Sequence, residues 1–155
     1  MSPETARRLA AINAEFYRTR AGLSASQRER PWPGMRLLLE RLPSAPARVL
    51  DVGCAHGRFA ALVRERFPDA RYVGIDASRE LLALAAARTD CPERAEWLAV
   101  DVAREGAIPG GPFDLIGLFG VIHHIPSEER RAHLLRALAA RLALGGTLAV
   151  AIWRA

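Results

Sequence analysis

One short stretch constrains the fold of this chain more than any other: residues 49–59, Val-Leu-Asp-Val-Gly-Cys-Ala-His-Gly-Arg-Phe. Its apolar half predicts a strand over 48–53, and a turn of small residues leads into a predicted helix over 58–67. Gly53 and Gly57 carry no Cβ, so the backbone can turn sharply there and approach a ligand closely. Because open α/β sheets bind ligands at the carboxyl ends of their strands, we expect a ligand site at this turn. The alternative is a plain joint between a strand and a helix.

The spacing of the glycines indicates which ligand to expect. A dinucleotide fingerprint requires G-x-G-x-x-G, but the second and third glycine positions fall on Ala55 and Arg58. A pyrophosphate is therefore not expected. An acidic strand end followed by G-x-[GA]-x-G suits a ligand with a ribose, an amine and a carboxylate, and it resembles motif I of the class I S-adenosylmethionine-dependent methyltransferases. That resemblance implies cofactor contacts from Asp51, Gly53, Cys54, Ala55 and Gly57.

The rest of the chain alternates between strands and helices, which predicts a doubly wound, Rossmann-like α/β fold with a parallel sheet. Ser78 and Ser127 are predicted N-caps of their helices, and Gly145-Gly146 is predicted to end the last helix. The predicted strands are 48–53, 71–76, 96–100, 113–121 and 147–153, and the predicted helices are 3–22, 35–42, 58–67, 78–88 and 127–144. We expect one domain, with a helical lid at 1–46 and the sheet-containing core at 47–155.

Acidic residues end three successive predicted strands. Asp76 follows Gly53 by 23 residues, close to the spacing at which an acid binds ribose hydroxyls. Asp101 is placed to accept from an exocyclic amine of adenine, with Val102 packing on the purine, and Asp51 would lie near a cationic amine. Each acid alone could equally be a helix N-cap or a solvated loop residue. Together, with Ala77 beside Asp76, they favour a ligand site.

The segment after the fourth strand, Phe119-Gly120-Val121-Ile122-His123-His124, should lie beside the first strand and line the cofactor site. We expect contacts from Phe119, Gly120 and Val121. His123 and His124 are candidates for a metal site, a catalytic base, substrate contact or a structural role. No acid or cysteine lies at ligand spacing from them, so a metal is not expected, and no catalytic residue is assigned.

The amino-acid composition excludes several further kinds of site and mechanism. All 22 basic residues are arginine, and the absence of lysine excludes a P-loop, a pyridoxal-phosphate Schiff base and a kinase-type lysine. Cys54 and Cys91 are isolated, so neither a disulfide nor a zinc site is expected. The sequence contains no apolar run long enough for a membrane span and no signal peptide, which favours a cytoplasmic protein. Residues 1–50 contain nine Arg and four Glu, a basic arm that suits a polyanion such as RNA or is simply a solvated helix.

The resemblance to the methyltransferase class extends along most of the chain. Residues 72–78, Tyr-Val-Gly-Ile-Asp-Ala-Ser, are similar to the second motif, and Asp101, 113–126 and 144–148 are similar to the later motifs in order. The resemblance implies S-adenosylmethionine as cofactor and a strand order of 3-2-1-4-5. The class continues with two further strands that form an antiparallel hairpin, which the sequence up to Ala155 lacks. The fifth strand is therefore expected to be an exposed edge, with self-association through it.

Two segments resemble one group within the class, the tRNA methyltransferases that esterify carboxymethyl groups on wobble uridines. These segments are 121–131 and the N-terminal residues Phe16-Tyr17, 24–28 and 31–33. The resemblance implies a tRNA acceptor. Arg28 and Trp32 are candidate cofactor contacts, and Arg28 or Arg30 could hold the cofactor carboxylate or a substrate anion, because arginine binds carboxylates with two parallel hydrogen bonds. Two alternatives stay open: a small-molecule O- or N-methyltransferase, and a cofactor-binding module without activity.

Overall fold

The computed structural model describes residues 4, 5, 8, 9, 11, 12, 15, 31–104 and 107–152. The seven described residues before position 16 are helical, in agreement with the predicted N-terminal helix. Arg28 and the other N-terminal residues of the tRNA-type resemblance, except 31–33, lie outside the described part. The division into a lid and a core therefore stays a prediction.

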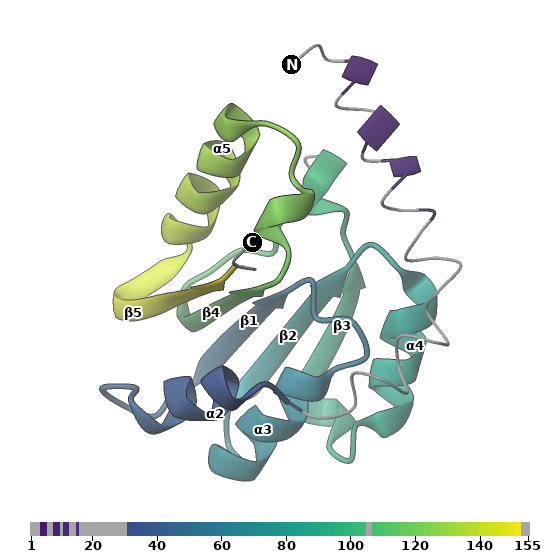
Figure 1. Cartoon of the computed structure of the whole chain (residues 1–155). Helices are drawn as coiled ribbons and strands as arrows, with labels where there is room; N and C mark the ends of the chain where they lie inside the picture. The colour runs from purple at the N-terminus through teal and green to yellow at the C-terminus, as the bar shows by residue number, and fades with distance from the viewer. Residues whose placement is uncertain are drawn as a thin grey trace.

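The sheet has the predicted order, β3-β2-β1-β4-β5, and every neighbouring pair is parallel (Figure 1). The three central strands contain mostly buried apolar runs, as expected where both faces of a parallel sheet are covered. The strands are β1 (Arg48–Val52), β2 (Arg71–Asp76), β3 (Ala95–Ala99), β4 (Phe113–Phe119) and β5 (Leu142–Ala151). The fold class and the strand order are confirmed.

Helices cover both faces of the sheet (Figure 1). On one face α2 and α3 pack on Val49 and Tyr72, and on the other α5 packs on Leu50 and Val52, so that alternate residues of β1 enter two separate cores. The Ser78 and Ser127 hydroxyls accept from the backbone N–H groups three residues on, which confirms both N-caps. The helices are α2 (Pro33–Glu40), α3 (Arg58–Arg66), α4 (Arg79–Arg88) and α5 (Glu128–Ala139), with short 3₁₀ turns η1 (Pro92–Arg94), η2 (Val102–Arg104) and η3 (Ile122–His124).

The prediction for the end of α5 is wrong. The helix stops at Ala139 rather than continuing to residue 144, and β5 begins at Leu142, so Gly145-Gly146 lies within the strand. The Arg141 carbonyl accepts from the Phe113 N–H at 2.8 Å, which brings the chain onto β4 within two residues of the helix end. The Arg141 guanidinium also donates to three backbone carbonyls, of Pro109, Ala137 and Ile108. These tertiary hydrogen bonds override the helical pattern of the apolar residues.

The two glycines instead form an irregularity in β5. Phe113 pairs with Leu142 but Leu115 pairs with Thr147, so the segment between them bulges out of register. Gly145 has φ +77°, a conformation that favours glycine, and Leu144 is fully exposed. β5 therefore has a longer and more irregular amino end than predicted.

Candidate functional site

The turn between β1 and α3 bends over the end of β2. Gly53 and Gly57 have φ of +72° and +80°, and Gly57 is the N-cap of α3. The N–H groups of Gly53 and Cys54 both donate to the Ile75 carbonyl, at 2.8 and 3.0 Å. Ala55 also has a positive φ, of +50°, which is strained for a residue with a Cβ. The turn thus places its backbone across the carboxyl end of the first two strands.

Asp76 ties this turn to β2. Its Oδ2 accepts from the Ala55 N–H at 3.0 Å, and its Oδ1 accepts from the Ser78 N–H at 2.9 Å. Burial raises the pKa of this carboxyl, and the hydrogen bonds from Ser78, Ala55 and Ala77 oppose that rise. These N–H donors leave part of the acceptor capacity of the carboxylate for a ligand hydroxyl.

Asp101 follows β3 at the same edge and opens the turn η2. Its Oδ1 accepts from the Ala103 N–H at 3.0 Å, and its Oδ2 lies 3.5 Å from Nε of Arg104. Val102 is half-buried and packs against the core beneath α5. The N-cap role considered for Asp101 from the sequence is therefore present in the structure, and its carboxylate remains half-buried at the edge.

Asp51 lies deeper than the other two acids, one residue before the end of β1. Its side chain is 3% exposed and accepts a hydrogen bond of 2.5 Å from the Tyr72 hydroxyl. Burial raises the pKa of Asp51 to about 7, while the Tyr72 hydrogen bond and the nearby charge of Arg58 oppose the rise. The sequence reading missed both partners. In the sequence, only the presence of a tyrosine among the apolar residues of the second strand indicates that a buried polar partner is present.

The loop after β4 meets the turn after β1. The place that a Cβ on Gly53 would take is filled by a methyl group of Val121. β4 ends at Phe119, two residues earlier than predicted, because Gly120 has φ +71° and turns the chain out of the strand. The Gly120 N–H still donates to the Ala151 carbonyl at 3.0 Å. Gly53, Gly120 and Val121 are thus brought together as expected.

Phe119 and Trp32 are placed in the core on the α3 side of the sheet. Phe119 packs edge-on against Phe59, with ring centroids 4.8 Å apart. The Arg58 guanidinium lies over the Trp32 ring, 4.3 Å from its centroid. These two aromatic residues therefore pack against other side chains of the protein. Their contact with a cofactor stays a prediction. Cys54 is buried, and burial raises the pKa of its thiol.

The histidine pair forms the turn η3 directly after this loop. The two rings contact each other, with centroids 4.1 Å apart, and His123 is exposed. Partial burial lowers the pKa of His123, so its neutral form is favoured. Within the described residues, no group of three His, Cys, Asp or Glu side chains could hold a metal ion.

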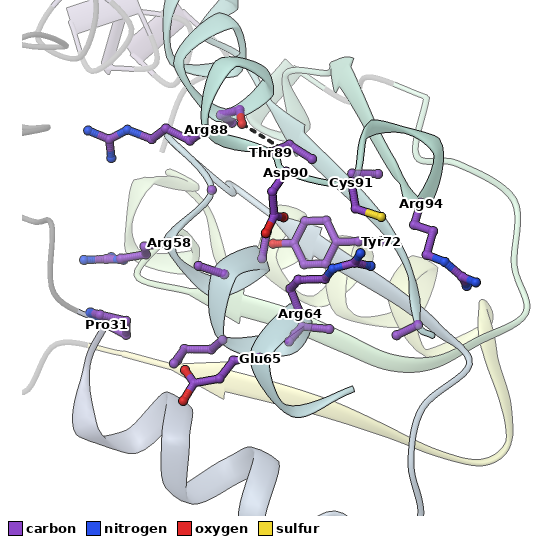
Figure 2. A pocket seen from close by; sticks show the side chains of 18 of the residues that line it. Pro31, Arg58, Arg64, Glu65, Tyr72, Arg88, Thr89, Asp90, Cys91 and Arg94 are labelled. Carbon is purple, nitrogen blue, oxygen red and sulfur yellow. Dashed lines mark hydrogen bonds between the residues drawn. The ribbon is translucent and has the colours of Figure 1, made fainter. Parts of the chain in front are cut away.

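A cavity of about 710 Å³ lies between α3 and α4, away from the strand-end acids (Figure 2). It begins at His56 and Gly57 and extends to Arg94 and Ala95, where β3 starts, with Tyr72 among its lining residues. The sequence reading did not predict it. Because the cavity reaches the amino ends of β2 and β3, it lies mostly outside the edge at which parallel sheets bind their ligands.

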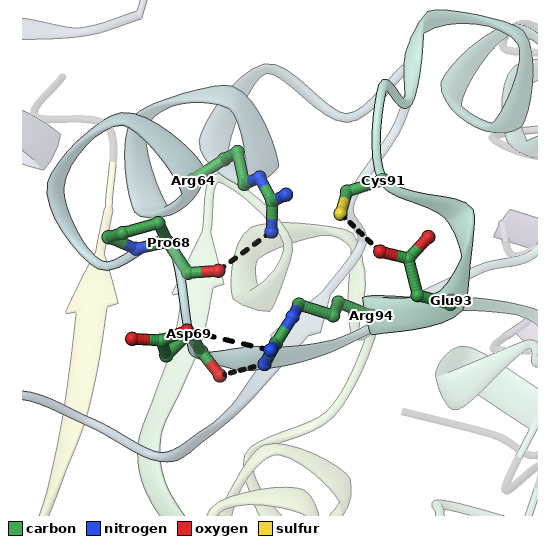
Figure 3. A network of polar contacts seen from close by, with 6 residues as sticks. All are labelled: Arg64, Pro68, Asp69, Cys91, Glu93 and Arg94. Atoms are coloured by element: carbon green, nitrogen blue, oxygen red, sulfur yellow. Dashed lines mark hydrogen bonds and ion pairs between the residues drawn. The ribbon is translucent and has the colours of Figure 1, made fainter.

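Arginines at the far end of this cavity are engaged in structural contacts (Figure 3). Arg64 donates to the Pro68 carbonyl at 2.7 Å, and Arg94 donates to the Asp69 carbonyl at 2.7 Å and lies 3.5 Å from its carboxylate. The Cys91 thiol donates to Glu93 at 2.6 Å, and this hydrogen bond raises the pKa of Cys91. The network joins the segments that precede β2 and β3, so we assign it to stability of the amino edge.

Comparison with known proteins agrees with the geometry of the edge. A family model described as "Methyltransferase domain" matches residues 50–148. Trans-aconitate 2-methyltransferase of Streptomyces avermitilis is 39% identical over 128 residues, 81% of this chain and 46% of that protein. The tRNA (carboxymethyluridine(34)-5-O)-methyltransferase alkbh8 of Xenopus tropicalis is 32% identical, over 98% of this chain and 23% of that protein. The chain spans less than half the length of both relatives.

A solved structure with a similar fold contains a bound ligand. The N-methyltransferase NodS of Bradyrhizobium japonicum, in complex with S-adenosyl-L-homocysteine, superposes with a TM-score of 0.62 at 25% identity, over 74% of this chain and 58% of that one. The fold and the strand-end acids define an S-adenosylmethionine-dependent methyltransferase domain of class I. The chain belongs to the methyltransferase domain family. The cofactor of the class is S-adenosylmethionine, the methyl donor whose demethylated product is bound in NodS. None of the described helices combines the length and the apolar character needed to cross a membrane.

Proposed function

We propose that this chain transfers a methyl group from S-adenosylmethionine to a carboxylate oxygen of its acceptor, giving a methyl ester. The observation that carries this proposal is the chemistry common to two relatives. The two names specify trans-aconitate and a carboxymethyluridine of tRNA as acceptors, which differ greatly in size but both carry a carboxylate group.

 The carboxylate of aconitate and that of a carboxymethyluridine are already nucleophilic at neutral pH, so esterifying either one needs no strong base.

The residues at the carboxyl edge fit the cofactor by their chemistry. The remaining acceptor capacity of Asp76 suits the ribose hydroxyls, and Asp101 suits the exocyclic amine of adenine. Asp51 supplies negative charge for the cofactor's ammonium group, and the bare backbone at Gly53 allows close approach. We assign supporting contacts to the neighbouring residues Cys54, Ala55, Gly57, Ala77, Val102, Phe119, Gly120, Val121 and Trp32, and to Arg28 outside the described part.

Methyl transfer to a carboxylate requires the protein mainly to align the two reactants. Bound S-adenosylmethionine supplies a methyl group on a sulfonium; as the acceptor oxygen bonds to the methyl carbon, the carbon–sulfur bond breaks and its electron pair stays on sulfur. The protein's contribution is to hold the acceptor in line with that bond and to exclude water. His123 and His124, in the turn after β4, are the candidates for acceptor contact.

Two acceptors are candidates for this reaction, and one of them is tRNA. It is supported by the Xenopus relative, which matches 98% of this chain, and by the nine arginines and four glutamates of residues 1–50. A small tricarboxylate acceptor is supported by the higher identity to the Streptomyces relative. The proposal covers both, because the bond formed is the same.

Methyl transfer with radiolabelled S-adenosylmethionine tests the proposal. The protein is incubated separately with trans-aconitate and with bulk tRNA, and the products are then treated with mild alkali. An ester releases its label as methanol, whereas an N-methyl product retains it. Transfer to one of these acceptors with alkali-labile label is expected. Binding of S-adenosylhomocysteine without transfer to either acceptor would instead favour the module without activity.

Salt dependence separates the two acceptors. If tRNA is bound through phosphates, log affinity should fall against log salt with a slope of about −0.7 to −0.9 per phosphate neutralised. Changing Arg7, Arg8, Arg18 and Arg20 together to Gln should reduce that slope and leave cofactor affinity unchanged. Weak tRNA binding that does not respond to salt would leave the small carboxylate as the acceptor.

A further inference from the structure

Asp51 lies in an unusual gap in the sheet. Its partners on both neighbouring strands are glycines, Gly74 of β2 and Gly117 of β4. The space that side chains would fill at these two positions is taken by the rings of Trp97 and Phe119. The carboxylate is therefore enclosed by aromatic groups, where an ion without polar partners would be costly.

Tyr72 is the polar partner that reaches into this gap. The parallel register pairs it with Val49, two residues before Asp51 on the same face, so its side chain spans that distance along the sheet. Packing fixes the ring, which lies 5.5 Å from the Trp97 ring and belongs to the core beneath α2 and α3. Burial and the nearby Asp51 raise the pKa of Tyr72 well above its usual value, so the hydroxyl remains a donor.

The other charged and titratable groups that act on Asp51 come from three neighbouring segments. Arg58, at the start of α3, favours the ionised carboxylate, and Asp76, at the end of β2, disfavours it. The Cys54 thiol of the turn also interacts with Asp51, and burial and the two carboxylates keep this thiol protonated. In addition to these groups, Tyr72 donates its direct hydrogen bond to the Asp51 carboxylate.

We propose that Tyr72 is a positioning residue that holds Asp51 ionised and oriented toward the cofactor's ammonium group, and that it thereby sets the pH at which the cofactor binds. This inference rests on the proposed function, because it takes the ligand at this edge to be S-adenosylmethionine. It adds a role for a side chain of β2 that does not itself reach the ligand.

The sign of the pH effect follows from the contacts. The pKa of Asp51 is about 7, so the carboxylate gains its charge as the pH rises through that value. Affinity for an ammonium-bearing ligand should therefore rise over the same range. The Tyr72 hydrogen bond lowers the pKa of Asp51, so its removal should move the rise in affinity to higher pH.

Calorimetric titration with S-adenosylhomocysteine, which carries the same ammonium group, tests this from about pH 5.5 to about pH 8.5. In Tyr72→Phe the midpoint of the rise in affinity should move up by about one pH unit, with roughly fivefold weaker binding at about pH 7. In Asp51→Asn the affinity should be low and nearly independent of pH. Adding Tyr72→Phe to Asp51→Asn should then change affinity little, because the group on which the hydroxyl acts has been removed.

Leu39→Val is the matched control, since it shortens a buried side chain of α2 in the same core and keeps the Tyr72 hydroxyl and the rings around Asp51. It should lower thermal stability without moving the midpoint. An unchanged midpoint in Tyr72→Phe, with wild-type binding intact, would overturn the role of Tyr72 and leave the proposed function standing. Absence of binding by the wild type across the whole pH range would overturn both.

Discussion

The backbone N–H of Ala55 donates to Oδ2 of Asp76 at 3.0 Å, which ties the turn after β1 to the end of β2. The other oxygen of Asp76 accepts from the Ser78 N–H at 2.9 Å, next to the start of α4. One carboxylate thus holds the turn and the start of a helix in place. The residue proposed to bind the ribose also maintains the geometry of its surroundings.

Asp76→Ala should therefore have two effects. Cofactor affinity should fall by roughly 1.5–3 kcal/mol, the scale of a hydrogen bond to a charged group, and the free energy of unfolding should fall by about 1–3 kcal/mol because two N–H groups lose their acceptor. Calorimetric titration and thermal unfolding measure the two separately. Asp90→Ala, an exposed acid, is the control and should change neither. Unchanged affinity in Asp76→Ala would remove this residue from the cofactor site.

Ala55→Gly should stabilise the protein. At φ +50° an alanine is strained by about 1–2 kcal/mol, which exceeds the entropy that a glycine adds to the unfolded chain. A gain of up to about 1 kcal/mol and a rise in melting temperature of roughly 2–4 °C are expected. The same substitution at Ala61, an exposed position inside α3, should instead destabilise by about 1 kcal/mol. A loss of stability in Ala55→Gly would show that the turn is not strained.

Asp51 should make stability fall as pH rises. The pKa of Asp51 in the folded protein is about 7, above the ordinary value of 3.8. The contribution of the protonated side chain to the free energy of unfolding is therefore fully present below about pH 4 and is lost as pH rises through 7. Asp51→Asn removes this loss. The difference in free energy of unfolding between this variant and the wild type should therefore grow in favour of the variant from about pH 4 to about pH 7, by at most about 4 kcal/mol. Denaturant unfolding at several pH values measures the difference. An advantage that shrinks as pH rises would contradict the assigned direction.

Self-association through β5 is a further expectation. Among the described strands β5 pairs with β4 alone, and Val150 and Ile152 are 43% and 70% exposed. Changing both to Lys should shift the sedimentation of the chain toward the monomer. Leu37→Lys, at a residue of α2 that is 45% exposed, adds a charge away from the edge and should have no such effect. A wild type that is monomeric at high concentration would contradict this role for β5.

Local sequence determined the architecture and the position of the site. The alternation of short apolar runs with helical patterns specified the parallel sheet. Ser78 and Ser127 specified where two helices begin, because capping depends on neighbours three residues apart. The spacing from Gly53 to Asp76 placed an acid beside the turn for a similar reason. One strand, one helix and one turn of ordinary length separate these residues, so their distance follows from the chain itself.

Tertiary structure decided what depends on segments far apart in the sequence. The end of α5 was set by hydrogen bonds from Arg141 to the segment before β4, which helical periodicity does not contain. The gap around Asp51 required the register of three strands to place Gly74 and Gly117 on either side of it. Its partner Tyr72 and the pKa of about 7 follow from that register and from burial, which only the packed sheet creates.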